Sequence, residues 1–333
     1  MHIFEFTRPS DPAAAIKATA QSKTAQQGAE ARFLGGGTTL IDLMKLNVET
    51  PSRVLDINRL PLDKIEDTPD GGLKIGATVR NSDLANNPRV LRDYSVLSQA
   101  ILSGASAQIR NMATTAGNLL QRTRCVYFRD TAMPCNKREP GSGCSAITGS
   151  NRTMAILGTS DHCIATNPSD MCVAMAALEA TIHVQGPKGM RAIPIGDFHL
   201  LPADTPNHET VLEPGDLITH VTLPPPVSGS RHFYLKLRDR ASYEFALASA
   251  AVVMNLDGEN VRYIRIALGG VGTKPWRSAE AEAALTGQPA SAANFRQAAE
   301  AALRNAKAQS ENKFKIELAK RCLVHALRMA ATA

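Results

Sequence analysis

FLGGGTTL, residues 33–40, is the stretch that decides how the N-terminal part of the chain folds. A β-type run, residues 31–34, leads into it, and a helix-type run, residues 40–46, follows it. Its three glycines lack Cβ atoms, so the backbone can approach a ligand closely. Thr38 and Thr39 are placed to cap the helix, whose free N–H groups and positive dipole end favour an anion. The stretch therefore indicates either a phosphate cradle or a plain strand-to-helix turn.

Strands and helices alternate around this stretch. Residues 2–6, 31–34 and 53–57 are predicted strands, and residues 11–21 and 40–46 are predicted helices. Strands separated by helices indicate a parallel or mixed α/β arrangement. We expect these elements to form a first unit that ends at residue 57.

A second unit is expected over residues 58–226 and a third over residues 229–333. The second contains a strand at 72–77, helices between 80 and 103, a second small-residue loop at 113–118 (ATTAGN), a helix after 168, a hairpin at 181–195 and a strand at 217–223. A run of three prolines, 224–226, marks the boundary. Beyond it, strands at 232–238, 246–256 and 263–269 and helices at 280–285, 291–308 and 314–331 predict an α+β unit with a three-stranded sheet.

Composition narrows the class of protein. The 333 residues carry a net charge of +6, and the basic residues are not gathered into a tract with aromatic residues, which argues against nucleic-acid binding. The longest apolar run, residues 246–256, is far shorter than the ~20 residues of a membrane span and suits a buried strand. The N-terminus has no charged-then-apolar pattern, so we expect no export signal on this chain and no membrane insertion.

Four of the six cysteines lie within one segment that is rich in Gly, Pro, Ser and Asn. Cys125, Cys135, Cys144 and Cys163 are separated by nine, eight and eighteen residues, and no Cys-x-x-Cys pair of the kind found in zinc ribbons occurs. Residues 121–152 contain six basic and two acidic side chains, a balance that suits a negatively charged four-thiolate cluster. An iron–sulfur cluster, a zinc ion and unliganded thiols all remain open. Cys172 and Cys322 fall on apolar helical patterns and are predicted core residues.

Several motifs occur in one order along the chain: FLGGGTTL at 33–40, IGATVR at 75–80, QIRNMATTAGN at 108–118, NPSD at 167–170 and KLRDRASY at 236–243. In this combination the chain resembles the FAD-binding medium subunits of the xanthine dehydrogenase/aldehyde oxidoreductase family of molybdenum hydroxylases. The segments RTRC, PCNKR and PGSGC, between 122 and 144, resemble the loop of those bacterial periplasmic aldehyde oxidoreductase FAD subunits that hold an extra [4Fe–4S] cluster. No Rossmann or P-loop fingerprint is present.

The resemblance implies a mixed α/β, α+β fold. A two-subdomain FAD-binding domain of the vanillyl-alcohol-oxidase/PCMH type, residues 1–57 and 58–226, precedes a C-terminal domain of the CO dehydrogenase flavoprotein type, residues 229–333. It also implies roles for matching positions. Around the FAD pyrophosphate would lie Arg32, Phe33, Leu34, Gly35, Gly36, Gly37, Thr38, Thr39 and Leu40. Other FAD contacts would be Thr114, Gly117, Asn118, Asp170, Ile218 and Lys236. The cluster ligands would be Cys125, Cys135, Cys144 and Cys163, within the loop 121–164, and no catalytic residue is expected.

In function, the resemblance implies an electron-transfer subunit of a heterotrimer. A molybdenum large subunit would oxidise an aldehyde to an acid, and a [2Fe–2S] small subunit would pass the electrons to FAD on this chain. FAD would then deliver them to an external acceptor other than NAD. The complex would reach the periplasm on a twin-Arg signal carried by another subunit, with the cytoplasm as the alternative. Two rival functions remain: a stand-alone FAD oxidase that uses Tyr243 or Arg240, and a zinc-stapled nucleotide-binding module.

Overall fold

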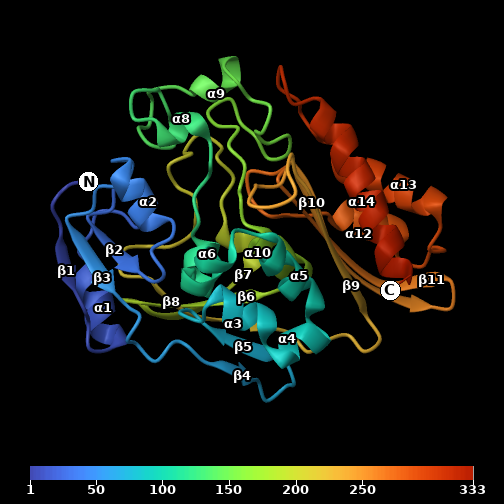
Figure 1. The fold of residues 1–333 in the computed structure, drawn as a ribbon, viewed down its shortest axis with the longest axis horizontal. Coiled ribbons are helices and arrows are strands. Elements are labelled where there is room, and N and C mark those ends of the chain that lie inside the picture. The colour runs from blue at the N-terminus through green and yellow to red at the C-terminus, as the bar shows by residue number, and fades with distance from the viewer. Residues whose placement is uncertain (333) are drawn as a thin grey trace.

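The computed structural model of the protein describes residues 1–332 and contains three β-sheets (Figure 1). The N-terminal sheet lies at one end and the C-terminal sheet and its helices at the other, with the third sheet and most short helices between them (Figure 1). The cysteine-bearing loop projects from the middle of the chain, in the green part of the ribbon (Figure 1). No helix among residues 1–332 is long and apolar enough to cross a membrane.

The N-terminal sheet is parallel, as the alternation of strands and helices predicts. Its strands β1 (Glu5–Thr7), β3 (Arg53–Asp56) and β2 (Ala31–Leu34) lie in the order β1-β3-β2. Two helices connect them, α1 (Pro12–Thr19) and α2 (Leu40–Lys45). The predicted strand at 2–6 begins later, because pairing starts only where Glu5 meets Arg53, and Ile3 is 99% exposed.

The middle sheet is antiparallel and has five strands in the order β4-β5-β8-β6-β7. These are β4 (Ile65–Asp67), β5 (Leu73–Gly76), β6 (Thr181–Gly186), β7 (Gly189–Pro194) and β8 (Leu217–Leu223). The helices of this region are α3 (Asn81–Asn86), α4 (Pro88–Asp93), α5 (Ser95–Ser103), α6 (Ala107–Met112), α7 (Thr115–Leu119), α10 (Asp170–Ala177) and α11 (Ile195–Phe198). The predicted break at Pro88 is present because the Asn87 side chain accepts hydrogen bonds from the Arg89 and Val90 amides and starts α4.

The C-terminal sheet contains the three predicted strands, and a two-residue strand extends it. The order is β12-β11-β10-β9, with β9 (Arg231–Leu237), β10 (Ala248–Asp257), β11 (Asn260–Gly269) and β12 (Trp276–Arg277). Helices α12 (Ala279–Leu285), α13 (Ala292–Leu303) and α14 (Phe314–Thr332) cover one face. On β10, Ala251 and Val253 join the core around α5 and α10, whereas Val252 and Met254 join the core under α12–α14. The continuous apolar run arises because both faces of this strand are buried.

The cysteine loop, residues 121–164, has only two short helices, α8 (Val126–Arg129) and α9 (Ser145–Thr148). Hydrogen bonds between side chains and backbone atoms fix the conformation of this loop. Asn136 donates to the His162 carbonyl oxygen at 3.0 Å and accepts from the amides of Gly141 and Gly143. Arg138 donates to the Phe128 carbonyl oxygen at 2.8 Å. The predicted irregular structure is therefore present, together with a small hydrophobic cluster around Phe128 that the sequence did not indicate.

Candidate functional site

The two small-residue loops pack directly against each other. A Cβ atom at Gly36 would lie 1.9 Å from the Met112 carbonyl oxygen, and one at Gly35 would lie 2.7 Å from the Thr114 hydroxyl oxygen. Gly37 has φ of +73°, in the left-handed region that favours glycine. The glycines are therefore required by the approach of the second loop and by the turn, and not only by a ligand.

A polar network holds the two loops together. The Asn58 side-chain amide donates to the Gly35 carbonyl oxygen at 2.9 Å and accepts from the Arg80 guanidinium at 3.0 Å. Arg80 also donates to the Met112 carbonyl oxygen on the second loop. Because one arginine bonds groups from both sides, the relative position of the loops is fixed before any ligand binds.

The second loop is the start of helix α7. The Thr115 and Ala116 amides each donate at 2.9 Å to carbonyl oxygens of residues 79 and 77. The segment IGATVR therefore holds the second loop in position. The Thr114 hydroxyl accepts from the Gly117 amide at 3.2 Å and caps the helix. In contrast, Thr39 occupies the N-cap position of α2 but its side chain accepts no hydrogen bond from that helix. Its hydroxyl is therefore not committed to the helix.

Two cavities with lining residues in common run along these loops. The smaller, about 140 Å³, is lined by all of residues 32–40 together with Thr114 and Gly117. The larger, about 520 Å³, shares Thr38, Thr39 and Gly117 with it and is also lined by Asn118, Asp170 and Lys236. The larger volume lies within the usual range for cofactor pockets. The structure thus brings fourteen of the fifteen predicted FAD-contact residues to these two adjoining cavities.

Ile218 is the exception. Its side chain lies on β8, is 3% exposed and packs in the core with residues of β5 and β6. It lines neither of the two cavities. No residue of β8 lines either cavity, so this strand does not face the site.

Basic side chains predominate around the larger cavity. Its charged lining residues are Arg110, Arg124, Arg129, Lys236, Arg240, Asp42, Asp170 and Glu244. The Arg129 side chain, at 2.8 Å, and Arg124, at 3.0 Å, hold the pKa of Asp42 below its usual value. The remaining positive balance suits a diphosphate, and the two loops supply N–H and hydroxyl donors for it.

Asp170 is engaged by the protein itself. Its carboxylate accepts from Lys236 Nζ at 2.8 Å and from the Tyr234 hydroxyl at 2.6 Å. Asp170 and Lys236, the two predicted FAD contacts, therefore lie together at the wall of the larger cavity, where they pair mainly with each other. Burial and the adjacent Asp170 carboxylate raise the pKa of Tyr234 well above its usual value, so the tyrosine stays protonated and donates.

Asn81 is a candidate that the sequence did not single out. It lines the larger cavity, is 4% exposed, and its side-chain oxygen has no hydrogen-bond partner among residues 1–332. A buried acceptor without a partner is costly unless a ligand or water satisfies it. The residue follows IGATVR directly, which is the only local signal that could have identified it.

The four loop cysteines line one small cavity. Cys125, Cys135 and Cys163 are buried and Cys144 is half-buried. Cys135 and Cys144 face each other in an isolated antiparallel bridge, and burial raises the pKa of the Cys125 thiol to about 12. No group of three or more His, Cys, Asp or Glu side chains within residues 1–332 is arranged to hold a metal ion. Cys172 and Cys322 are buried in the two large cores, as predicted.

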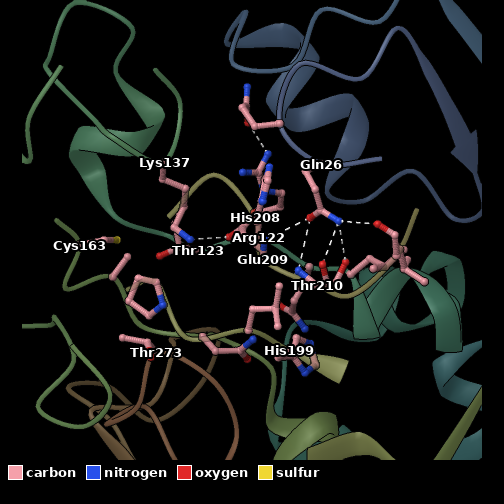
Figure 2. Close-up of a pocket in the computed structure, with 18 of the residues that line it drawn as sticks. Gln26, Arg122, Thr123, Lys137, Cys163, His199, His208, Glu209, Thr210 and Thr273 are labelled. Atoms are coloured by element: carbon pink, nitrogen blue, oxygen red, sulfur yellow. Dashed lines mark hydrogen bonds and ion pairs between the residues drawn. The ribbon is translucent and has the colours of Figure 1, made fainter. Parts of the chain in front are cut away.

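A polar pocket (Figure 2) shares Lys137 and Cys163 with the cysteine cavity, and Arg32 and Arg122 with the smaller cavity along the Gly loop. Glu209 lies at its centre, paired with Arg122 and with Lys137 Nζ at 2.9 Å (Figure 2). Burial alone would raise the pKa of Glu209, but Arg122 and Lys137 outweigh it and bring the pKa to about 2. No local pattern in the sequence marks this carboxylate, because its partners Lys137 and Arg122 are more than seventy residues away.

Comparison with known proteins places the chain in a family. The FAD binding domain in molybdopterin dehydrogenase matches residues 2–226, and the CO dehydrogenase flavoprotein C-terminal domain matches residues 233–330. The aldehyde oxidoreductase FAD-binding subunit PaoB of Escherichia coli is 52% identical over 331 residues, covering 99% of each chain.

Two further relatives have the same architecture. The glyceraldehyde dehydrogenase medium chain of Sulfolobus acidocaldarius is 30% identical, over 77% of this chain and 74% of its own. A reconstituted CO dehydrogenase from Oligotropha carboxidovorans superposes with a TM-score of 0.78 at 23% identity, covering 100% of this chain and 99% of that one, which shows the shared fold. The chain therefore belongs to the FAD-binding medium subunits of the xanthine dehydrogenase/CO dehydrogenase family of oxidoreductases.

Proposed function

We propose that this chain is the FAD-binding, electron-transfer subunit of a molybdenum-dependent aldehyde oxidoreductase. The observation that carries the proposal is the pair of adjoining cavities along residues 32–40, 114–118 and Lys236, in a chain 52% identical over its length to an aldehyde oxidoreductase FAD-binding subunit. When bound, FAD accepts electrons from one partner and passes them to another.

The chain's own residues bind and orient the cofactor. The backbone amides of the Gly loop and the hydroxyls of Thr38 and Thr39 would hold the pyrophosphate, and Asn81 would hydrogen-bond the cofactor through its unpaired oxygen. Tyr243 is 55% exposed, and its backbone oxygen accepts from Arg240, so neither residue is held in the manner of a buried acid or base. The subunit would therefore position the cofactor and leave substrate chemistry to another chain.

The partners that we propose are a molybdenum-cofactor large subunit and a [2Fe–2S] small subunit, with an external acceptor other than NAD. A stand-alone FAD oxidase is the alternative. The two are separated by mixing the purified, FAD-loaded chain with an aldehyde under anaerobic conditions. We expect no flavin reduction by the chain alone and rapid reduction after co-expression with both partners. Reduction by the isolated chain would favour the oxidase.

We further propose that Cys125, Cys135, Cys144 and Cys163 hold a [4Fe–4S] cluster. Support comes from their convergence on one cavity and from the basic balance of the loop. Each thiolate of such a cluster binds a different iron, so the four sulfurs do not have to approach as closely as the ligands of one zinc ion. The irregular backbone between them is held by Asn136 and Arg138 rather than by regular structure.

Iron analysis tests the cluster. Anaerobically purified protein should contain about four irons per chain, and Cys135→Ser should lose most of them. Cys322→Ser is the matched control, because Cys322 is equally buried but lies on α14 in the other core. Protein that contains zinc and no iron would contradict the cluster and would favour the zinc-stapled module.

For localisation, we propose that the chain reaches the periplasm within a complex exported on a partner's twin-Arg signal. The support is the likeness of its cysteine loop to that of the periplasmic enzymes. Cell fractionation of the source organism tests it: the chain should appear in the periplasmic fraction only when the signal-bearing partner is present. A cytoplasmic chain in cells with an intact partner would contradict it.

A further inference from the structure

Lys137 is a buried cation beside the cysteine cavity. It is 9% exposed and lines both that cavity and the polar pocket of Figure 2. Its ammonium donates to Glu209 Oε1 at 2.9 Å and to the Pro206 carbonyl oxygen at 3.0 Å. Lys137 follows Cys135 by only two positions, so one short segment of the loop supplies both a cysteine and a positively charged side chain.

Glu209 does not neutralise Lys137 on its own, because a second cation shares it. Arg122 pairs with both Glu209 and Glu49, and Glu49 also pairs with Arg32 at 3.0 Å. The result is an alternating row of five charges, three positive and two negative, that runs from the Gly loop to Lys137. The row carries one net positive charge, and Lys137 is its end at the cysteine cavity.

Cys163 is the sulfur that faces this cation. Among the four loop cysteines, Cys163 alone lines both the cysteine cavity and the polar pocket, and Lys137 also lines both. Both side chains are labelled in Figure 2 at the same end of the pocket. A positive charge at this place stabilises negative charge on the sulfur, and because Lys137 is buried, solvent screens this interaction only weakly.

We propose that Lys137 is a redox-tuning residue, whose buried positive charge beside Cys163 raises the reduction potential of the [4Fe–4S] cluster. The inference rests on the cluster proposed above. One-electron reduction adds one negative charge to the cluster and its thiolates, and a nearby cation favours that more negative form. The electron comes from dithionite in the experiment below and from the partner subunits in the complex.

A redox titration of the full chain, followed by the low-temperature EPR signal of the reduced cluster, tests this. Lys137→Gln should shift the equilibrium toward the oxidised cluster by about tenfold, which is a potential lower by about 59 mV for one electron. Lys137→Arg keeps the charge and should stay close to wild type. Arg152→Gln is the matched control: it removes a basic residue of the same loop, but one that is paired with Asp239 and about half exposed.

A second variant keeps the proposal testable if Lys137→Gln loses its cluster. Glu209→Gln removes the negative partner and should raise the potential, measured at mildly acidic pH so that Lys137 remains protonated. A purely structural role for the ion pair predicts loss of iron in both variants and no shift of opposite sign.

The outcomes separate the two proposals. Wild-type protein without iron would overturn the cluster and this inference together. Wild-type protein with about four irons, and a potential in Lys137→Gln equal to that in Arg152→Gln, would overturn only the tuning role. A Glu209→Gln potential that is unchanged or lower would do the same.

Discussion

Lys236 Nζ lies 2.8 Å from Asp170 Oδ2, and the two side chains are 3% and 9% exposed. The pair joins β9 of the C-terminal sheet to the first turn of α10 at the wall of the larger cavity. Because a buried charge without its partner is costly, Asp170→Ala should lower the free energy of unfolding by about 3–5 kcal/mol. Urea denaturation of the full chain measures this.

The control for that prediction is an exposed pair. Glu300 pairs with Lys320 on the surface, where its side chain is largely exposed, so Glu300→Ala should cost less than about 1 kcal/mol. If Asp170→Ala lowers the free energy of unfolding no more than Glu300→Ala does, then the ion pair of Asp170 does not stabilise the contact between α10 and β9. Asp170 would then act only in cofactor binding, the role that the family resemblance implies.

Gly36→Ala tests the packing of the two loops. The added Cβ atom would meet the Met112 carbonyl oxygen at 1.9 Å, so the loops must separate and the cofactor site must deform. We expect the Kd for FAD to rise at least about tenfold, a loss of about 1.4 kcal/mol or more of binding free energy, as measured by equilibrium titration with FAD. Gly196→Ala is the matched control, because its Cβ would meet no atom within 4 Å. An unchanged Kd in Gly36→Ala would show that the loop tolerates the methyl group by moving as a unit.

Asn81→Ala tests the residue that sequence reasoning missed. Loss of one hydrogen bond from a buried acceptor is worth about 0.5–1.5 kcal/mol, so the Kd for FAD should rise up to about tenfold. Asn86→Ala, on the exposed side of the same helix, should leave the Kd unchanged. Equilibrium titration of the deflavinated chain with FAD gives both values, and equal affinities would remove Asn81 from the site.

His199 gives the chain a pH-dependent stability. Burial lowers its pKa to about 4 from 6.5, and its Nε2 lies 2.9 Å from the Leu119 carbonyl oxygen. Between these two values the unfolded chain binds a proton that the folded chain does not, so stability decreases as pH falls from about 6.5 to about 4. His199→Gln keeps a donor for Leu119 and should flatten this part of the profile of melting temperature against pH. An unchanged profile would mean that His199 has the same pKa in the folded and the unfolded chain.

Local pattern predicted most of the elements, and long-range contacts decided the rest. The Gly loop, the helix after it and the run at 246–256 were predictable because glycine, caps and buried strands leave local signals. The short strands β4 and β12 were missed because each pairs for only two or three residues, and pairing cannot be read from one segment. The proposed boundaries after residues 57 and 226 stay a prediction.

The candidate site shows the same division. The glycines and threonines of residues 33–40 indicated an anion cradle or a plain turn, and the family resemblance assigned residues 32–40, Thr114, Gly117 and Asn118 to FAD. The assignment of Ile218 to the FAD site came from the family resemblance, but its side chain lies in the core. The side of a sheet on which a side chain lies depends on how the sheet packs, and one segment of sequence does not determine this. Glu209 and Lys137 had no local signal at all, since ion pairs between distant loops leave no periodicity in the sequence.

The most direct test of the account is a single-turnover reaction of the assembled complex, compared with this chain alone, under anaerobic conditions. Flavin absorbance is followed after mixing with an aldehyde. The account predicts that FAD on this chain is reduced only when the molybdenum and [2Fe–2S] subunits are present, and that Gly36→Ala abolishes the signal. Flavin reduction by the isolated chain would contradict it.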